Sequence, residues 1–337
     1  MLMLLATTRS ALVHVALTAR DLAIFETLTQ VRFLTATAIE WLHFPDRRPV
    51  WEADMQARLK SAAHPPYRVG RVVHRRLHLL AAAGYLSRMV RPTAIRKHTW
   101  GGREPDLLSL TEDGALALAA TTDDAHMAVE SYRVRERSSS VTQHTAEIGE
   151  VYAALRVKIA TMPGMAMEDW RSDHMTARSY DHLTVVRQRA GGMERVSLPV
   201  VPDGTFVLVH PHGRLRVFIE VDRGTRRLET WREKIEAYHA YAGSAELRAR
   251  YQTDTFVLLT IAPTVAQQQR LMNATAAVLG GASSHYLFTL RAAVHPLRIG
   301  GEWQKITAVN RAVVAAGFQR QATEKVSATT SRHVFLQ

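Results

Sequence analysis

The chain of 337 residues contains no cysteine. Without thiols it can form neither a disulfide framework nor a thiolate metal site, so an intracellular home is expected. No hydrophobic run is long enough to span a bilayer, and the apolar opening, residues 1–6, has neither the charged leader nor the cleavage site of a secretory signal. We therefore expect a cytoplasmic protein with no membrane partner.

Acidic residues are missing from one long stretch. Residues 55–103 contain no Asp or Glu but many Arg and Lys, in a chain whose formal net charge is +12. A purely solvated surface, the alternative interpretation, would normally mix charges of both signs. The asymmetry predicts contact with a polyanion, with nucleic acid as the first choice, and binding that weakens steeply as salt rises.

The remaining composition is that of an ordinary globular protein, with 47% hydrophobic and 22% charged residues. The length allows two domains with separate cores. We predict an N-terminal domain over 16–120, a linker over 121–142, a C-terminal domain over 143–318 and a polar tail over 319–337.

The predicted N-terminal domain begins with a capped helix, in which Thr18 is the N-cap and Asp21 lies three residues further on. A shorter helix starts at Leu34, and a basic helix follows over 69–83, ended by Gly84. Two strands, 85–90 and 107–110, then flank a tip at 92–105. This order is typical of a winged helix-turn-helix domain, in which the third helix enters the major groove and the hairpin touches the DNA backbone.

The spacing on the basic helix predicts that Val72, Val73, Leu77 and Leu80 face inward while its charged residues face out. The expected DNA contacts are the basic residues of that helix, of the segment before it and of the hairpin: Arg68, Arg71, Arg75, Arg76, Arg88, Arg91, Arg96, Lys97 and Arg103.

Helices and strands mix in the C-terminal domain, which predicts a central mixed sheet covered by helices, an α/β sandwich. The expected helices are 143–161, 227–242 and 265–279. The expected strands are 205–210, 216–222, 255–260 and 286–290.

Carboxylates gather at one end of a predicted hairpin. Alternation along 216–222 places Glu220 and Asp222 on one face of the second strand, and Asp203 opens the first strand. Antiparallel pairing would bring Asp203 close to Glu220 or Asp222, whereas a slip of one residue would turn it away. The register is an assumption at this point.

Such carboxylates suit a hard cation, Mg²⁺ or Mn²⁺, and a cation of this kind suits phosphodiester cleavage. Lys234, on the following helix, is placed to offset developing charge or to orient water. The plainer interpretation is structural. Pro-Asp-Gly is a common turn, Asp222 can end its strand, and Lys234 can be a surface side chain with a buried stem. His210 and His212 lack the spacing of a zinc centre and are expected in an exposed turn.

Several motifs together resemble the replication-relaxation family of plasmids and integrative elements of bacteria. The matching residues are 17–22, 110–114, His144, 202–204, the Glu-Val-Asp-Arg-Gly-Thr string at 220–225, Lys234 and Tyr238. The resemblance implies a winged helix joined to a domain similar to PD-(D/E)xK restriction-type nucleases. It also implies a role in plasmid replication or in relaxase-like nicking during transfer.

In the nuclease pattern Asp203 would be the first acid and Glu220 the second, with Asp222 and Glu147 as further metal ligands. The chain departs from the pattern, because Asp222 stands where the family pattern of such nucleases has lysine. There are two alternatives. Either Lys234 has taken over the role of the pattern's lysine, or the site binds metal poorly and the domain only holds DNA. Tyr238 is the candidate nucleophile of a competing covalent mechanism, ranked below hydrolysis by metal-activated water.

The alternative to an enzyme is a DNA-binding regulator or replication accessory that keeps an inactive nuclease-like domain. DNA is the expected partner in both cases. A second copy of the chain and other replication or transfer proteins are further expected partners.

Overall fold

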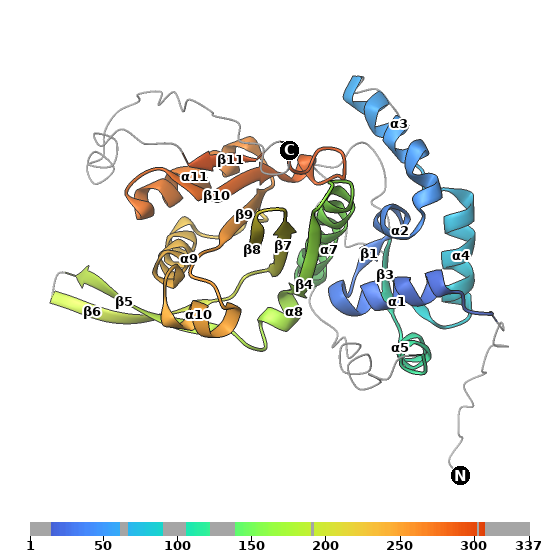
Figure 1. Cartoon of the computed structure of the whole chain (residues 1–337), viewed down its shortest axis with the longest axis horizontal. Helices are drawn as coiled ribbons and strands as arrows, with labels where there is room; N and C mark the ends of the chain where they lie inside the picture. Colours follow the sequence, from blue (N-terminus) through green and yellow to red (C-terminus); the bar gives the residue numbers. More distant parts are fainter. Residues whose placement is uncertain are drawn as a thin grey trace, which may run out of the picture. The chain divides into compact units, whose positions relative to one another are not determined.

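The computed structural model describes residues 15–60, 67–89, 106–121, 139–189, 192–301 and 303–306. Within these stretches helices mix with parallel and antiparallel strands (Figure 1), which confirms the predicted mixture of helix and sheet. Contacts between Cα atoms divide the chain into two units, Met1–Ala153 and Ala154–Gln337. The division falls inside helix α7, Ser139–Ala160. Most of the predicted linker, the hairpin tip and the polar tail lie outside the described residues.

The first unit combines helices with a small antiparallel sheet of strand order β1-β3-β2. Its elements before α7 are α1 Ala19–Val31, β1 Leu34–Thr35, α2 Ala36–His43, the 3-10 turn η1 Pro45–Arg47, α3 Arg48–Lys60, α4 Arg71–Ala82, β2 Leu86–Met89, β3 Leu107–Leu110 and α5 Glu112–Ala119.

The predicted start of α1 is confirmed. Thr18 accepts the backbone N–H of Asp21, and the Asp21 carboxylate accepts the backbone N–H of Thr18, which makes a capping box. The prediction for the basic helix α4 is right in place but partly wrong in orientation. Val73, Leu77 and Leu80 are buried, whereas Val72 is 67% exposed. The buried stripe is therefore narrower than predicted.

Helix α3 was not predicted. Most of its residues are polar, so its sequence has no apolar stripe. Trp51 is fully buried, whereas Val50 is exposed. A single large anchor leaves no periodic signal, so only the folded environment reveals this helix.

The second unit is built on a six-stranded mixed sheet of order β11-β10-β9-β8-β7-β4. Pairs β7–β8, β4–β7 and β10–β11 are antiparallel, and β9 runs parallel to both β8 and β10. The strands of this sheet are β4 Ala166–Ser172, β7 Gly204–His210, β8 Gly213–Val221, β9 Val257–Ala262, β10 Ser283–Leu290 and β11 Gln304–Ile306. The other elements are α8 Asp173–Thr176, the hairpin β5 Asp181–Arg189 with β6 Gly192–Val200, α9 Leu228–Tyr241, α10 Ala245–Tyr251, α11 Val265–Leu279 and the 3-10 turn η3 Arg291–Ala293.

The hairpin β7–β8 agrees with the prediction, and its tight turn lies at Pro211 and His212 because His210 pairs with Gly213. Strand β4, the hairpin β5–β6 and helices α8 and α10 were not predicted. In β5–β6, outer positions such as Val186 and Met193 are exposed apolar residues. A ribbon exposed on much of its surface does not need strict alternation of polar and apolar residues, so the pattern was too weak to recognise.

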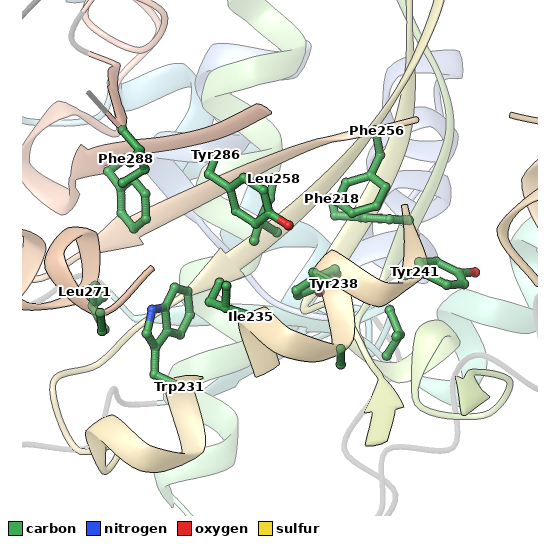
Figure 2. Close-up of a cluster of buried hydrophobic side chains, with 14 of the residues drawn as sticks. Phe218, Trp231, Ile235, Tyr238, Tyr241, Phe256, Leu258, Leu271, Tyr286 and Phe288 are labelled. Atoms are coloured by element: carbon green, nitrogen blue, oxygen red, sulfur yellow. The ribbon is translucent and has the colours of Figure 1, made fainter. Parts of the chain in front are cut away.

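One face of the sheet packs on α9 and α11. Figure 2 shows the core that results, in which Trp231, Ile235 and Tyr238 of α9 meet aromatic and aliphatic side chains of the strands, including Phe218 and Leu258. Trp231, Ile235 and Tyr238 recur at helical spacing and form the buried stripe of α9. This packing brings the polar residues of the same face of β8 up against α9.

Candidate functional site

The register of β7 and β8 places Asp203 beside Glu220. Gly204 pairs with Ile219, and the backbone N–H of Asp203 donates to the Ile219 carbonyl at 3.0 Å. Asp203 Oδ2 accepts the backbone N–H of Val221 at 2.8 Å. The predicted proximity of Asp203 and Glu220 is confirmed, and the register left open by the sequence is settled.

Glu220 lies at the centre of a compact ionic cluster. Its side chain is 1% exposed, and Lys234 Nζ donates to its Oε2 at 2.5 Å. Tyr238 Oη donates to Oε1 at 2.6 Å, and Arg226 Nη1 lies 3.6 Å from Oε2. Burial raises the pKa of Glu220 and Asp203 adds to the rise, while Lys234 and Arg226 oppose it. The lysine predicted to lie near the acids is therefore in contact with one of them.

Asp222 lies one residue beyond the end of β8 and has different partners. Its Oδ2 accepts hydrogen bonds from the backbone N–H of Gly224 at 3.0 Å and from Gln267 Nε2 of α11 at 2.9 Å. Gly224 has a φ of 76°, which suits glycine in a tight turn. The structural interpretation of Asp222 as the residue that ends the strand is thus supported. Asp222 Oδ1 accepts no hydrogen bond from the described residues.

Arg226 was not among the predicted site residues. It precedes α9 and interacts with Glu220, Asp203 and Asp222. Burial lowers the pKa of its guanidinium, but these carboxylates outweigh burial and raise it, so Arg226 stays charged. The only sequence signal was a basic residue just beyond the Asp-Arg-Gly-Thr turn.

Tyr238 is fully buried, and its hydroxyl is held by Glu220. Burial and the nearby Glu220 carboxylate raise the pKa of Tyr238 well above its ordinary value. Both features disfavour attack by its oxygen on a DNA phosphate, because a nucleophile must be reachable and readily deprotonated.

Glu147 lies on α7, where its Oε1 accepts a hydrogen bond from Gln143 Nε2 at 3.0 Å. Its role as a metal ligand stays a prediction. His210 and His212 lie at the β7–β8 turn, where the backbone N–H of His212 donates to His210 Nδ1, as expected for a turn.

The donor set at Glu220 suits a particular kind of cation. No three His, Asp or Glu residues in the part of the chain that the structure describes are grouped to hold an ion by themselves. Mg²⁺, however, is commonly bound by one or two carboxylates, with waters and substrate phosphates as the other ligands. Asp203 and Glu220 are neighbouring buried carboxylates and fit this pattern. In the structure Lys234 and Arg226 lie beside Oε2 of Glu220 and Tyr238 donates to Oε1, so both oxygens that a cation would use already have partners.

Three of the predicted DNA-binding residues, Arg68, Arg71 and Arg75, are exposed on and just before α4. Arg88 on β2 is also exposed, and its Nε contacts Asp106 at 2.5 Å. Arg91, Arg96, Lys97 and Arg103 lie outside the described residues.

Arg76 does not face out as predicted. Its Nε donates to Asp21 Oδ1 at 2.8 Å, its Nη2 also contacts Asp21 Oδ2, and Nη2 donates to the Ala16 carbonyl at 2.8 Å. Asp21 is fully buried and needs a counter-charge. Burial raises the pKa of Asp21, but the hydrogen bonds from Arg76 and Thr18 outweigh it and hold that pKa below its ordinary value. Arg76 thus ties α4 to α1.

A second buried acid, Glu40 on α2, was also missed. It accepts hydrogen bonds from Arg47 Nε at 3.0 Å, Tyr67 Oη at 2.9 Å and the backbone N–H of Gly70 at 3.2 Å. Gly70 is the N-cap residue of α4, so Glu40 fixes the start of that helix. A lone acid within the apolar run 38–42 was the available sequence signal.

The family model of replication-relaxation proteins matches residues 25–257, which span most of both units. The chain belongs to the replication-relaxation family. No curated protein and no solved structure matches the chain closely enough to count as a relative. No helix in the described stretches combines the length and apolar character needed to cross a membrane. The Asp203–Glu220 pair and α4 both fall within the region that the family model matches.

Proposed function

We propose that this replication-relaxation protein binds DNA of a plasmid or other mobile element and nicks it with the help of a divalent cation. The observation that carries the proposal is the contact between Glu220 and Lys234, with Asp203 as the cross-strand neighbour of Glu220. Two carboxylates and a lysine ammonium at the end of a hairpin supply the charged groups that a phosphodiester hydrolase requires.

DNA binding is the part of the proposal that the first unit supports. The order α1, β1, α2, α4, β2, β3 follows that of a winged helix, with α3 added between α2 and α4. Arg71 and Arg75 on α4 and Arg88 on β2 are exposed, in the two elements that such a domain presents to DNA. The region holds no acid over 55–103 that would repel phosphate.

The nicking chemistry is assigned to the second unit. Mg²⁺ or Mn²⁺, when bound, would polarise the phosphodiester and lower the pKa of a bound water. Asp203 and Glu220 would hold the ion, and Asp222, which directly follows β8, would supply an additional oxygen. Lys234 would offset the negative charge that develops on the phosphate. Hydrolysis is preferred to covalent attack because the Tyr238 hydroxyl is buried and bonded to Glu220.

A supercoiled-plasmid nicking assay tests the proposal. Relaxed product is expected with Mg²⁺ or Mn²⁺ and not with EDTA, and it should disappear in Asp203→Asn and Glu220→Gln. Asp254→Asn is the matched control, because Asp254 is an exposed acid that pairs with Arg248 on α10. Equal nicking by all of these variants would refute the assigned site.

The second candidate function is a DNA-binding regulator without catalysis. It is favoured by the occupation of both Glu220 oxygens by Lys234 and Tyr238 and by the aspartate at position 222. A parent protein that binds DNA in a salt-sensitive manner but gives no product with either metal, on plasmids carrying the element's own origin, would establish this function instead.

A further inference from the structure

Arg226 offers a guanidinium whose donors are largely unused. Its side chain is 27% exposed, and its Nη1 lies 3.6 Å from Glu220 Oε2, while the charges of Asp203 and Asp222 also act on it. That distance is longer than a hydrogen bond. A planar fork with five N–H donors is therefore charged, close to solvent and poorly matched to the carboxylate beside it.

Lys234 shares this situation in part. Its Nζ donates one hydrogen bond, to Glu220 Oε2, and none of its other N–H groups has an acceptor in the described stretches of the chain. Both cations thus converge on the same carboxylate oxygen, whereas Oε1 is taken by Tyr238. One oxygen has two lone pairs, so most of the N–H donors of an ammonium and a guanidinium stay unused there.

The exposed fractions of the side chains show which members of the cluster lie nearer to solvent. The Lys234 and Arg226 side chains are 15% and 27% exposed, while Glu220 is buried and Asp203 and Asp222 nearly so. An anion that approaches from solvent therefore meets the cations before the acids. A phosphate has several oxygens and would accept from both cations at once, with bidentate geometry at the arginine.

We propose that Arg226 and Lys234 form a phosphate-binding pair, which Glu220 holds in the ligand-free protein and which a DNA phosphate takes over. This inference rests on the proposed function and assigns its phosphate contact. When Arg226 and Lys234 transfer to the phosphate, Glu220 Oε2 loses its partners and becomes available. DNA and a divalent cation should then each improve the binding of the other, because coupling between two ligands is reciprocal.

Glu220→Gln gives the most direct test. The amide is similar in shape but no longer holds the two cations, so DNA affinity in EDTA should rise by on the order of tenfold, the size of one added charge-assisted contact. The probe is a short fluorescein-labelled duplex of arbitrary sequence, followed by anisotropy over a range of salt concentrations. A merely structural role for Glu220 would give weaker or unchanged binding.

The double variant Glu220→Gln/Arg226→Gln separates a local contact from a general change in charge. The gain in affinity should vanish in this variant and persist in Glu220→Gln/Arg248→Gln, in which an arginine of α10 is removed instead. If both double variants keep the gain, the inference is overturned while DNA binding stands. Absence of salt-sensitive binding by the parent protein would instead refute the proposed function and the inference with it.

A second measurement does not depend on Glu220 variants being folded. The buffer contains Ca²⁺, a hard cation that takes oxygen ligands as Mg²⁺ does. Arg226→Gln should then lower duplex affinity. It should also reduce the slope of log K against log salt by about 0.9, the value for one lost phosphate contact. Arg226→Lys should keep the slope and lose part of the affinity, and Arg248→Gln should match the parent. An unchanged slope in Arg226→Gln overturns the inference.

Discussion

The Tyr238 hydroxyl of α9 donates a 2.6 Å hydrogen bond to Oε1 of Glu220 on β8. A similar bond joins the Tyr241 hydroxyl, one turn further along α9, to Asp181 Oδ2 at 2.5 Å. Both rings pack against Phe218 in the core that Figure 2 shows. The two tyrosines therefore form a matched pair, of which only Tyr238 touches the proposed site.

Tyr238→Phe tests whether Tyr238 attacks DNA. We expect nicking to persist within a few-fold, because Lys234 still holds Glu220, and we expect the free energy of unfolding to fall by about 1–2 kcal/mol from the lost hydrogen bond. The measurements are the plasmid assay and urea denaturation, with Tyr241→Phe as the control for lost buried hydroxyls. Complete loss of nicking in Tyr238→Phe alone, in a protein as stable as the control, would restore the covalent mechanism.

Arg75 and Arg76 are neighbours on α4 with different environments. Arg75 is exposed, whereas Arg76 pairs with buried Asp21. Arg75→Gln should reduce the salt slope of DNA binding by about 0.9 and leave stability unchanged. Arg76→Gln should leave the slope unchanged and cost about 2–3 kcal/mol of stability, because Asp21 stays buried without its counter-charge.

Both variants remove one positive charge from the same helix, so each serves as the control for the other. Duplex titrations over a series of salt concentrations and urea denaturation give the two readouts. A reduced slope for Arg76→Gln at full stability would mean that this side chain leaves Asp21 to contact DNA, contrary to our expectation.

Glu40 should position α4 for DNA. Glu40→Gln weakens the bonds to Arg47 and to the start of α4 at Gly70, so we expect a loss of about 2–3 kcal/mol in stability. DNA affinity should fall while the salt slope stays constant, since no phosphate contact is removed. Glu52→Gln, which removes an i,i+4 pair with Arg48 near the surface, should cost less than about 0.5 kcal/mol. Equal losses in the two variants would contradict the positioning role.

Periodic segments could be predicted from the sequence, and α11 is the clearest case. Its predicted range, 265–279, is the observed one, because Thr264 caps its start, Gly280 ends it in a left-handed conformation, and apolar residues recur between them. The pairing of Asp203 with Glu220 was also within reach, since the turn at 211–213 leaves few registers for the hairpin.

Arg226 and Arg76 mark the limits of prediction from the sequence. Arg226 lies outside helix and strand, so no period fixes the direction of its side chain. For Arg76 the helical spacing allowed an outward direction. In the structure its side chain instead pairs with the buried Asp21 of α1, a contact that depends on tertiary packing. The capping role of Asp21 could be predicted from the sequence, but its pairing with Arg76 could not.

His43 should make the stability of the first unit depend on pH. Burial, and then the nearby Arg20, lower the pKa of His43 from 6.5 to about 4, and its Nε2 lies 3.0 Å from Thr27 Oγ1. Thr27 Oγ1 donates to the Ala23 carbonyl, so the neutral ring is the donor toward Thr27. Between pH 6.5 and 4 the unfolded chain binds a proton that the folded chain does not. Stability should therefore fall as pH drops through this window, by up to about 3 kcal/mol.

His43→Gln isolates this contribution, because glutamine keeps an N–H donor but does not titrate. Carboxylates also lose stability on acidification, so the informative quantity is the difference between parent and variant. We expect the parent to lose stability relative to the variant as the pH falls from 6.5 to 4, and the difference to be constant above pH 7. His78→Gln, on an exposed position of α4, is the control for the loss of a histidine. Parallel curves for the parent and His43→Gln, measured by urea denaturation, would show that His43 becomes protonated in the folded chain as readily as in the unfolded one.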